Sequence, residues 1–590
     1  MNTPIIVEFF AAPAPIPTGP PPDCQAGAPV AATPGGRATG IAFLPGQTMA
    51  QAVYLSGNFA PPALCSGLAA CGRCRMRVLT PEHAPAPTET DRRRFTEDEL
   101  RLGWRLGCRH MPRPGMRAAL PPEIRASGFA AFQEFDAPAA MEIELPPAIK
   151  GDCGHRPGRT LGLAVDIGTT TLEWELFPLA SESGGTPPPP LWRGACINPQ
   201  MGAGSDVLAR LAVAGTPGGG ESLRRLTLAA LRSLQADSLI PERSGFPAPE
   251  LAGLCLAGNP AMTAITLGLD TAGLAAAPYA LPTTGGGWAE LPGLAPAWIP
   301  PQLSPFSGGD ISAGYAFLAC NPAREAPPYP FLLADMGTNG EFLLALKPDL
   351  AFTASVALGP ALEGTGLSHG TEARAGAVAG FQARPGGPVP LLLEEQPGRE
   401  GWRAVPATGN EASPGITGTG YLSLLHTLLR HGGMDEDGRF IPARGGIFRD
   451  ALSEGAGGTG QCLRLPLGLA LYAADVEELL KVKAAFSLGL RRLFARAGIA
   501  ARDLAAVCLA GALGRHTDKE ALEGLGFFPP GMAKRLCSVG NASLAGAALL
   551  LRRPDARDAL CRWAVRVRPV DLASDPEFMR DYTAHMRFRW

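Results

Sequence analysis

The chain has 590 residues, which is long enough for several domains with separate hydrophobic cores. Its 52 lysine and arginine residues almost balance its 54 aspartate and glutamate residues, which argues against nucleic acid or an anionic membrane as a partner. No apolar run approaches the roughly 20 residues that span a bilayer, and the N-terminus lacks the basic start and long apolar stretch of a signal peptide. We therefore expect a soluble, cytoplasmic protein.

The first part of the chain is rich in proline, which recurs between residues 13 and 22. Such a composition favours an extended or flexible chain with no core of its own. We therefore expect residues 1–37 to form a flexible leader. Order is expected after that, because residues 41–44 have the pattern of a strand and residues 49–54 that of a helix start.

Four of the cysteines form a spaced set. They are Cys65, Cys71, Cys74 and, some thirty residues later, Cys108. The pattern resembles that of plant-type ferredoxins, in which four thiolates hold a [2Fe–2S] cluster, although the first gap here is one residue longer. Gly67 and Gly72 would let the backbone approach a cluster and direct amide N–H groups at sulfur. A zinc site or four unrelated buried thiols are the alternatives, but zinc usually takes two paired knuckles and Cys108 has no near partner.

This pattern predicts a first domain over residues 38–111 with the small β-grasp fold of ferredoxins. The strand, the helix and the thiol loop occur in the expected order, and residues 100–108 return the fourth cysteine. Residues 112–158 have mixed character and are predicted to be a linker. The other cysteines are scattered singly, and those within apolar runs, such as Cys255 and Cys508, behave as small hydrophobes. That usage suits a reducing compartment.

Two distant segments share one pattern of strand, Asp-x-Gly-Thr and strand. They span residues 161–177 and 331–344. A second pair, residues 251–258 and 504–511, consists of apolar strands that end in Leu-Ala-Gly before a helical stretch. Two such pairs in the same order indicate an internal duplication.

The duplicated pattern resembles the superfamily of actin, the sugar kinases and the heat-shock ATPases, whose paired lobes of ribonuclease H-like fold clamp ATP. The resemblance implies that glycine turns and threonine hydroxyls bind the phosphates, while aspartates organise Mg²⁺ and the attacking water. It makes Asp166 and Asp335 the catalytic candidates. The implied nucleotide contacts are Gly168, Thr169, Thr170 and Thr171 in the first loop, Gly337, Thr338, Asn339 and Gly340 in the second, and the strand-end glycines Gly258, Gly511 and Gly514. The alternatives are ordinary hairpin turns, or a duplicated fold that has lost its nucleotide.

We expect the first lobe over residues 159–325, the second over 326–569 and a C-terminal tail over 570–590. Asp310 and Glu363 are further candidates for contact with water or metal, with surface carboxylates as the alternative. The glycine-rich turn Gly415 to Gly420 precedes an apolar helix, and either adds backbone donors at a helix N-terminus or serves packing. A structural role is expected for the three histidines near glycine-rich turns or helices, His369, His426 and His516.

A ferredoxin-like domain in front of an Asp-Gly-Thr ATPase resembles the reductive activators of corrinoid proteins. The marks of that family here are the cysteine loop with Cys108, Asn198-Pro199-Gln200, Asp206-Val207, residues 258–262, 335–341, 359–364 and 510–514. Two departures are Thr417, where the family usually carries cysteine, and Ala-Leu-Gly after Gly511, where it usually has Gly-Phe-Gly. Residues 1–37 and 570–590 match nothing in the pattern.

The resemblance implies an α/β multidomain protein that passes one electron through the cluster to return a Co(II) corrinoid to Co(I), at the expense of ATP. Its implied cofactors are a [2Fe–2S] cluster, ATP and Mg²⁺. Its implied partners are a corrinoid protein and an upstream low-potential electron donor. A homodimer is one assembly that the resemblance leaves open. Two alternatives remain: an ATP-dependent electron donor for another low-potential enzyme, and a nucleotide-binding redox sensor without catalysis.

Overall fold

The computed structural model describes residues 5–11, 38–43, 46–59, 61–62, 64, 67, 69, 71–121, 160–179, 190–247, 249–384, 387–395, 402–409, 413–441, 452–454, 461–511, 514 and 517–590. Several predictions therefore fall outside the described residues. They concern most of the leader and of the linker, Cys65, His516, and the family departure at residues 512–513.

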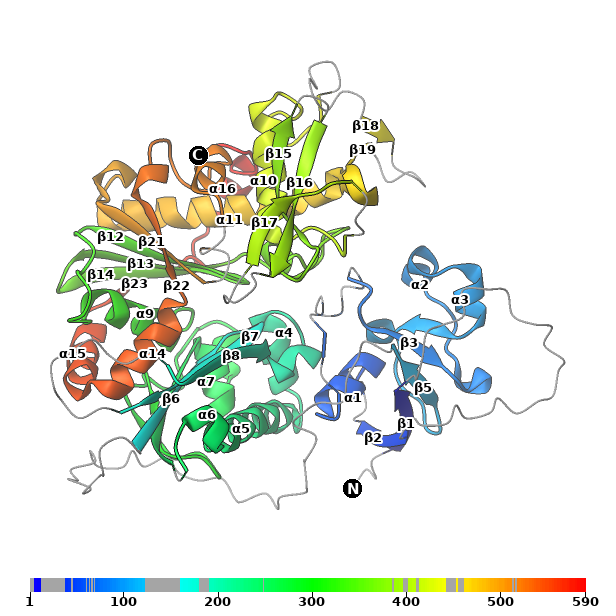
Figure 1. Ribbon diagram of the computed structural model, residues 1–590, viewed down its shortest axis with the longest axis horizontal. Coiled ribbons are helices and arrows are strands. Elements are labelled where there is room, and N and C mark those ends of the chain that lie inside the picture. The colour runs from blue at the N-terminus through cyan, green and yellow to red at the C-terminus, as the bar shows by residue number, and fades with distance from the viewer. Residues whose placement is uncertain are drawn as a thin grey trace.

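The first domain is built on a five-stranded sheet in the order β2-β1-β5-β3-β4. Its elements are β1 Ile5–Ala11, β2 Ala38–Phe43, α1 Met49–Leu55, β3 Arg75–Val78, η1 Pro81–His83, α2 Glu89–Arg94, α3 Glu97–Arg101, β4 Trp104–Leu106, η2 Gly107–Arg109 and β5 Arg117–Leu120. Helix α1 begins where expected, because Thr48 and Gln51 cap it reciprocally through their side chains. Met49, Val53 and Met76 lie in the core of this domain, which stands at the right of Figure 1.

Two predicted limits of this domain were wrong. Strand β1 lies in the predicted leader, yet it pairs antiparallel with β2 and parallel with β5. The physical reason is that its residues, IIVEFFA, are mostly β-branched or aromatic and favour a strand, whereas the prolines come later. Strand β5 lies beyond residue 111 and pairs with β3, so the start of the predicted linker also belongs to the sheet.

The first lobe carries a six-stranded sheet in the order β10-β11-β9-β6-β7-β8. Its elements are β6 Thr160–Ile167, β7 Thr171–Pro178, β8 Trp192–Ile197, η3 Pro199–Gly202, α4 Val207–Ala214, α5 Gly219–Ser238, α6 Pro241–Ser244, β9 Glu250–Gly258, α7 Pro260–Leu267, α8 Ala272–Ala275, β10 Gly287–Ala289, β11 Ala297–Ile299 and α9 Gly309–Ala319. Leucines spaced along one face of α5, including Leu223, Leu226 and Leu234, bury that face against the sheet.

The second lobe carries a six-stranded sheet in the order β22-β21-β12-β13-β14-β23 and two three-stranded sheets, β15-β16-β17 and β18-β19-β20. Its elements are β12 Phe331–Met336, β13 Asn339–Lys347, β14 Leu350–Ala357, η4 Pro360–Glu363, β15 Val378–Arg384, β16 Gly387–Glu395, β17 Trp402–Pro406, α10 Gly418–Arg430, β18 Leu452–Glu454, β19 Gln461–Arg464, η8 Pro466–Gly468, β20 Ala470–Tyr472, α11 Ala473–Ala497, η9 Ala501–Asp503, β21 Ala506–Ala510, α13 Lys519–Gly524, η10 Ala533–Arg535, β22 Leu536–Gly540, α14 Ala542–Arg552, α15 Pro554–Ala564, β23 Arg568–Pro569 and α16 Phe578–Ala584.

The predicted duplication is confirmed by the strand pairing. In the first lobe β6 runs parallel to β9 and antiparallel to β7, which is antiparallel to β8. In the second lobe β12 runs parallel to β21 and antiparallel to β13, which is antiparallel to β14. Each Asp-x-Gly-Thr motif lies at the tip of the first hairpin of its lobe, so the two motifs occupy equivalent places.

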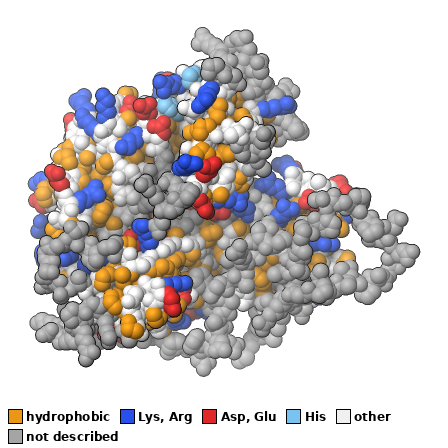
Figure 2. Space-filling view, in the orientation of Figure 1, with side chains coloured by type: hydrophobic (Ala, Val, Ile, Leu, Met, Phe, Trp, Pro, Cys, Tyr) orange, Lys and Arg blue, Asp and Glu red, His pale blue; other side chains and the backbone are white. Residues whose placement is uncertain are grey.

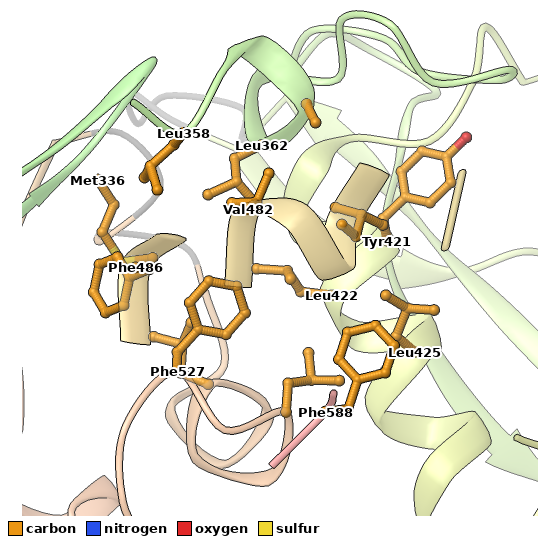
Figure 3. Close-up of a cluster of buried hydrophobic side chains, with 14 of the residues drawn as sticks. Met336, Leu358, Leu362, Tyr421, Leu422, Leu425, Val482, Phe486, Phe527 and Phe588 are labelled. Atoms are coloured by element: carbon orange, nitrogen blue, oxygen red, sulfur yellow. The ribbon is translucent and has the colours of Figure 1, made fainter. Parts of the chain in front are cut away.

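One core lies inside the second lobe, and another joins the two lobes. Figure 3 shows part of the core inside the second lobe, where Leu425 of α10 lies beside Phe588 and where Phe486 of α11 and Phe527 also point inward. A second core joins the two lobes, because helices α9 and α14 pack on each other between the two sheets. The lobes therefore share buried apolar surface.

The predicted C-terminal tail is also part of the fold. The amide of Val570 donates to the Thr353 carbonyl of β14 over 2.8 Å, and α16 packs on α11. The apolar residues Phe578, Tyr582 and Phe588 attach this segment to the core of the second lobe. Within the described residues, even the longest helix, α11 with 25 residues, is too charged to cross a bilayer, and none of the other helices there has the length and apolarity to do so.

Candidate functional site

A cavity of about 710 Å³ lies between the lobes and is lined by residues of both. Both Asp-x-Gly-Thr turns face it, which brings the predicted phosphate loops together across the lobes. On the face of the molecule drawn in Figure 2, described acidic and basic side chains are interspersed, as expected from the near-zero net charge. The predicted residues that line the cavity are Asp166, Gly168, Thr169, Thr170, Thr171, Asp335, Gly337, Thr338, Asn339 and Gly511.

Asp166 at the end of β6 is held by the other lobe. Asn541 and Ser543 at the start of α14 donate hydrogen bonds of 2.8 Å to its two carboxylate oxygens. Burial nevertheless raises the pKa of Asp166 to about 8, and the carboxylates of Asp310 and Glu173 add to the rise. The carboxylate is therefore fixed in position, but no basic side chain of the described part of the chain balances its charge.

Three further acids share the cavity with Asp166. Burial, with Asp310 and Glu173 nearby, raises the pKa of Asp335 to about 7, and burial raises that of Asp310 to about 6. The pKa of Glu341 lies well above its usual value through burial and the neighbouring acids. Oε1 of Glu341 is buried and has no hydrogen-bond partner among the described residues, which is costly without a cation.

These four carboxylates are suited to a hard divalent cation. Mg²⁺ prefers oxygen ligands and keeps several waters, so it needs only one or two direct carboxylate contacts. Within the described residues, no three acid, histidine or cysteine side chains form a closed metal site. The orphaned oxygen of Glu341 and the unbalanced charge nevertheless fit a cation that is bound together with phosphate groups.

Glu363 at the end of η4 joins the two phosphate loops. Its carboxylate accepts a hydrogen bond of 2.5 Å from Thr170 Oγ1 of the first loop and one of 2.7 Å from Thr338 Oγ1 of the second. The two hydroxyl oxygens are themselves 3.4 Å apart. Neither Glu363 nor Asp310 is a surface carboxylate, because both line the cavity. The two hydroxyls that would bind a phosphate therefore donate to Glu363 instead.

The first loop rests on a buried polar scaffold that sequence reasoning missed. Arg210, fully buried in α4, donates to the carbonyl of Thr169 and, over 3.0 Å, to that of Gly204. The side-chain Nδ2 of Asn198 donates to the Gly168 carbonyl over 2.7 Å, and its backbone N–H donates to the Thr170 carbonyl over 2.8 Å. The available signal was a single arginine within the apolar helix VLARLAVA.

The strand-end glycines serve different purposes. Gly511 has φ +78°, and a Cβ there would lie 2.6 Å from Oδ1 of Asp335, so only glycine leaves room for that carboxylate. Gly258, Gly340 and Gly514 do not line the cavity, and a Cβ at each of them would meet packed backbone or side-chain atoms.

The cavity extends from the acids to an apolar arm. Its walls there are Phe381, Leu391, Leu393, Trp402 and Ala404, which come from the sheet β15-β16-β17. The start of α10 also lines the cavity, but a Cβ at Gly418 would collide with the Leu362 carbonyl, so packing explains that glycine. His369 stacks on Tyr472 at 6.3 Å, as a structural role requires.

The structure brings three of the four predicted cluster ligands together. The pKa of the Cys74 thiol is raised by a hydrogen bond with Cys108, by burial and by the nearby Cys71. The amide of Arg73 donates to Sγ of Cys71 over 3.5 Å, which is how such loops stabilise cluster sulfur. Left-handed φ angles at Gly67, Ala69 and Gly72 curl the loop. Cys65, the fourth predicted ligand, lies outside the described residues.

The thiol domain packs directly on the first lobe. Helix α1 lies against η3, so that Met201 joins the core of the thiol domain and Leu55 that of the lobe. The amide of Met49 at the start of α1 donates to the carbonyl of His110, just after Cys108, over 2.7 Å. Because η3 begins next to Asn198, a short chain of contacts links the first phosphate loop to the thiol loop.

Two ribonuclease H-like lobes that present paired Asp-x-Gly-Thr turns to one cavity define an actin-like protein of the ASKHA class. A model of the RACo middle region matches residues 161–321, and a model of the C-terminal domain of RACo, the ASKHA domain, matches residues 330–589. Together they cover more than two thirds of the chain. The chain belongs to the RACo family, which implies an iron–sulfur cluster and ATP binding by the ASKHA domain.

Similar proteins with names that refer to corrinoid activation or reduction agree with this family. The corrinoid activation enzyme RamQ of Eubacterium limosum is 26% identical over 72% of this chain and 70% of its own length. The [Co(II) methylated amine-specific corrinoid protein] reductase of Methanosarcina barkeri is 31% identical over 49% of this chain, which spans about half (51%) of that relative. A solved structure of a reductive activator for corrinoid, iron–sulfur protein matches 99% of this chain and 98% of its own, with TM-score 0.59 and 21% identity, which supports the fold.

Proposed function

We propose that this protein reductively activates a corrinoid protein, using ATP to pass one electron through a [2Fe–2S] cluster and return Co(II) to Co(I). The observation that carries the proposal is the direct packing of a thiol-bearing β-grasp domain on a lobe whose phosphate loop lines the inter-lobe cavity. The names of the two curated relatives, a corrinoid activation enzyme and a Co(II) corrinoid protein reductase, support the substrate.

The thiol domain supplies the ligands of the cluster. Cys71, Cys74 and Cys108 converge as described, and Cys65 precedes them with the spacing that favours [2Fe–2S] over zinc. Bound there, the cluster supplies a one-electron relay. The amide of Arg73 and the left-handed turns of the loop would stabilise its reduced charge through hydrogen bonds to sulfur.

The cavity between the lobes is suited to MgATP. Thr170 and Thr338 would donate to phosphate oxygens, and the acids Asp166 and Asp335 would organise Mg²⁺ and the attacking water. Asp310 at the start of α9 adds a further carboxylate at this end. The apolar arm beside Trp402 has the chemistry to receive the adenine base.

Energy coupling follows from the position of Glu363. Its carboxylate holds both threonine hydroxyls, so a triphosphate must displace it and change how the loops are joined. A plant-type cluster lies near about −400 mV, and each 100 mV of uphill transfer costs about 2.3 kcal/mol per electron. A nucleotide-dependent rearrangement of the lobes would offset a gap of that size.

The remaining expectations belong to the same proposal. Electrons would come from an upstream low-potential donor, and the protein would act in the cytoplasm, where its scattered cysteines stay reduced. A homodimer is one assembly consistent with this role.

The decisive experiment is anaerobic. Cluster-reconstituted protein is mixed with a Co(II) corrinoid methyltransferase subunit and a reductant, and Co(I) absorbance is followed with and without MgATP. Co(I) that forms only with MgATP, and not in a Cys71→Ala variant, would support the proposal. No Co(I) despite an intact cluster and measurable ATP binding would favour a different low-potential acceptor.

A further inference from the structure

Two cysteines outside the thiol domain face each other in the second lobe. Cys508 lies on β21 and Cys537 on β22, and the two residues are direct partners in the parallel pairing of these strands. Their sulfur atoms are 3.6 Å apart. We infer that Cys508 and Cys537 form a reversible disulfide, an oxidation site that reports on peroxides or small disulfides and acts on the nucleotide cavity.

The geometry meets what such a bond requires. Neighbouring strands of a sheet lie about 4.8 Å apart, within the Cα separations that disulfides span, and the sulfurs need only approach from 3.6 Å to about 2.05 Å. Cys508 is buried, whereas Cys537 is partly exposed and therefore open to a small oxidant. While it is protonated, the Cys537 thiol donates to the Val507 carbonyl over 3.4 Å, and ionisation releases it from that contact.

The surroundings make Cys537 the attacking thiol. The hydrogen bond shared with Cys508 lowers the pKa of Cys537, and the positive charges of Arg324 and Lys519 contribute. The thiolate is the form that reacts with peroxide. Cys508, with a raised pKa in the buried position, stays a thiol and serves as the resolving group.

The chemistry balances with hydrogen peroxide as the oxidant. The Cys537 thiolate attacks one peroxide oxygen, the O–O bond breaks, and a sulfenic acid and hydroxide form. The Cys508 thiol then displaces water from the sulfenic acid, so two thiols are oxidised by two electrons and one peroxide becomes two waters. A small dithiol reverses the bond by exchange.

The Cys508–Cys537 disulfide would change the geometry of the cavity, because β21 and β22 both end at it. β21 leads to Gly511, which contacts Asp335, and β22 leads to Asn541 and Ser543, which hold Asp166. Drawing the sulfurs together by more than 1 Å therefore moves the supports of both catalytic aspartates. A displacement of about 1 Å at such groups can cost about 100-fold in activity.

The first lobe offers a matched control. Cys255 occupies the equivalent place on β9, but its partner on the neighbouring strand is Trp298 rather than a cysteine. The duplicated fold thus keeps a buried cysteine at this position in both lobes, and only the second lobe places a second thiol across from it among the described residues.

The test uses the full-length, cluster-loaded protein with its cluster oxidised. It is treated with one equivalent of hydrogen peroxide, free thiols are alkylated, and non-reducing digestion with mass spectrometry identifies cross-linked peptides, while visible absorbance verifies the cluster. A peptide joining residues 508 and 537, cleaved by dithiothreitol, is expected. Its absence while the cluster stays intact would overturn the inference without the need for any variant.

The functional consequence is measured as affinity for a non-hydrolysable ATP analogue and rests on the proposed function. Peroxide should weaken binding at least tenfold in the wild type and in Cys255→Ser, but not in Cys537→Ser or Cys508→Ser. An equal loss in Cys537→Ser would overturn the effect on the cavity. Absence of analogue binding before any treatment would instead contradict the proposed function, because the peptide measurement does not depend on nucleotide.

Discussion

Glu363 bridges the two predicted phosphate loops, because its carboxylate accepts a hydrogen bond from one threonine of each loop. Replacing it with glutamine keeps the shape but weakens two hydrogen bonds to Thr170 and Thr338 and removes a negative charge beside the triphosphate. Hydrogen bonds to charged groups are stronger than those to neutral groups. Breaking the two bonds to residue 363 should therefore cost about 1–2 kcal/mol less in the glutamine variant. We expect Glu363→Gln to bind a non-hydrolysable ATP analogue about 5- to 30-fold more tightly by titration calorimetry.

The control is Glu372→Gln, which removes a carboxylate at an exposed position of the same cavity wall. It should change the affinity only slightly, because screening by solvent weakens exposed charges. Weaker binding by Glu363→Gln than by the wild type would mean that Glu363 contacts Mg²⁺ or the nucleotide rather than competing with it.

Lys483 is a buried lysine that holds the C-terminal segment to α11, and it makes stability depend on pH. Its Nζ donates to the carbonyls of His585 and Arg589. Burial, with Arg491 and Arg589 nearby, lowers its pKa from 10.5 to about 7. Between these two pH values the unfolded chain binds more protons than the folded one, so the free energy of unfolding should rise with pH.

The rise attributable to Lys483 should approach about 1.4 kcal/mol per pH unit above pH 7. It is measured by urea unfolding of the wild type and of Lys483→Met between about pH 7 and pH 9. The difference between the two proteins isolates this residue from other titrating groups. A difference that stays constant across that range would show that Lys483 remains charged in the folded protein.

The contact of α1 with η3 is the element that ties the thiol domain to the lobes. A Cβ at Gly202 would lie 2.6 Å from Cβ of Tyr54 and 3.0 Å from its carbonyl carbon, so alanine there must push α1 away. We expect Gly202→Ala to keep analogue affinity within about threefold but to lose most ATP-dependent Co(I) formation. Hydrogen exchange should show α1 deprotected while β6 and β7 remain protected.

Gly215→Ala is the matched control, since its Cβ would meet nothing closer than the Leu211 carbonyl at 3.5 Å. It should leave both exchange and Co(I) formation unchanged. If Gly202→Ala formed Co(I) at the wild-type rate, the packing of α1 on η3 would have no part in coupling.

Local sequence patterns predicted much of the fold, but contacts between residues far apart in the sequence could not be predicted from them. The hairpins around Asp166 and Asp335 were evident because strand alternation and turn glycines are encoded within a few residues. The capture of Asp166 by Asn541 and Ser543 was not, because the partners are 375 and 377 residues apart in sequence. Strand β1 was missed for a related reason: its partner strand follows a long proline-rich stretch.

The two lobes share one core and form one unit, whereas the thiol domain is a smaller separate unit. We expect the two units to unfold separately. The core between α9 and α14 contains Ala164 and Cys255 of the first lobe with Phe331 and Leu343 of the second, so neither lobe can unfold without exposing the surface of the other. The thiol domain has a core almost entirely of its own. We expect calorimetry of the full chain to show two transitions, one for the thiol domain and one for the paired lobes.

MgATP should separate these transitions further, because its proposed site lies between the lobes. At a free concentration 100 times the dissociation constant it would stabilise the lobes by about 2.7 kcal/mol and raise their melting temperature by several degrees. The thiol transition would move only through α1 and η3, so Gly202→Ala should abolish whatever shift it shows. A single transition that MgATP moves as a unit would instead mean that the thiol domain is as firmly coupled to the cavity as the lobes are to each other.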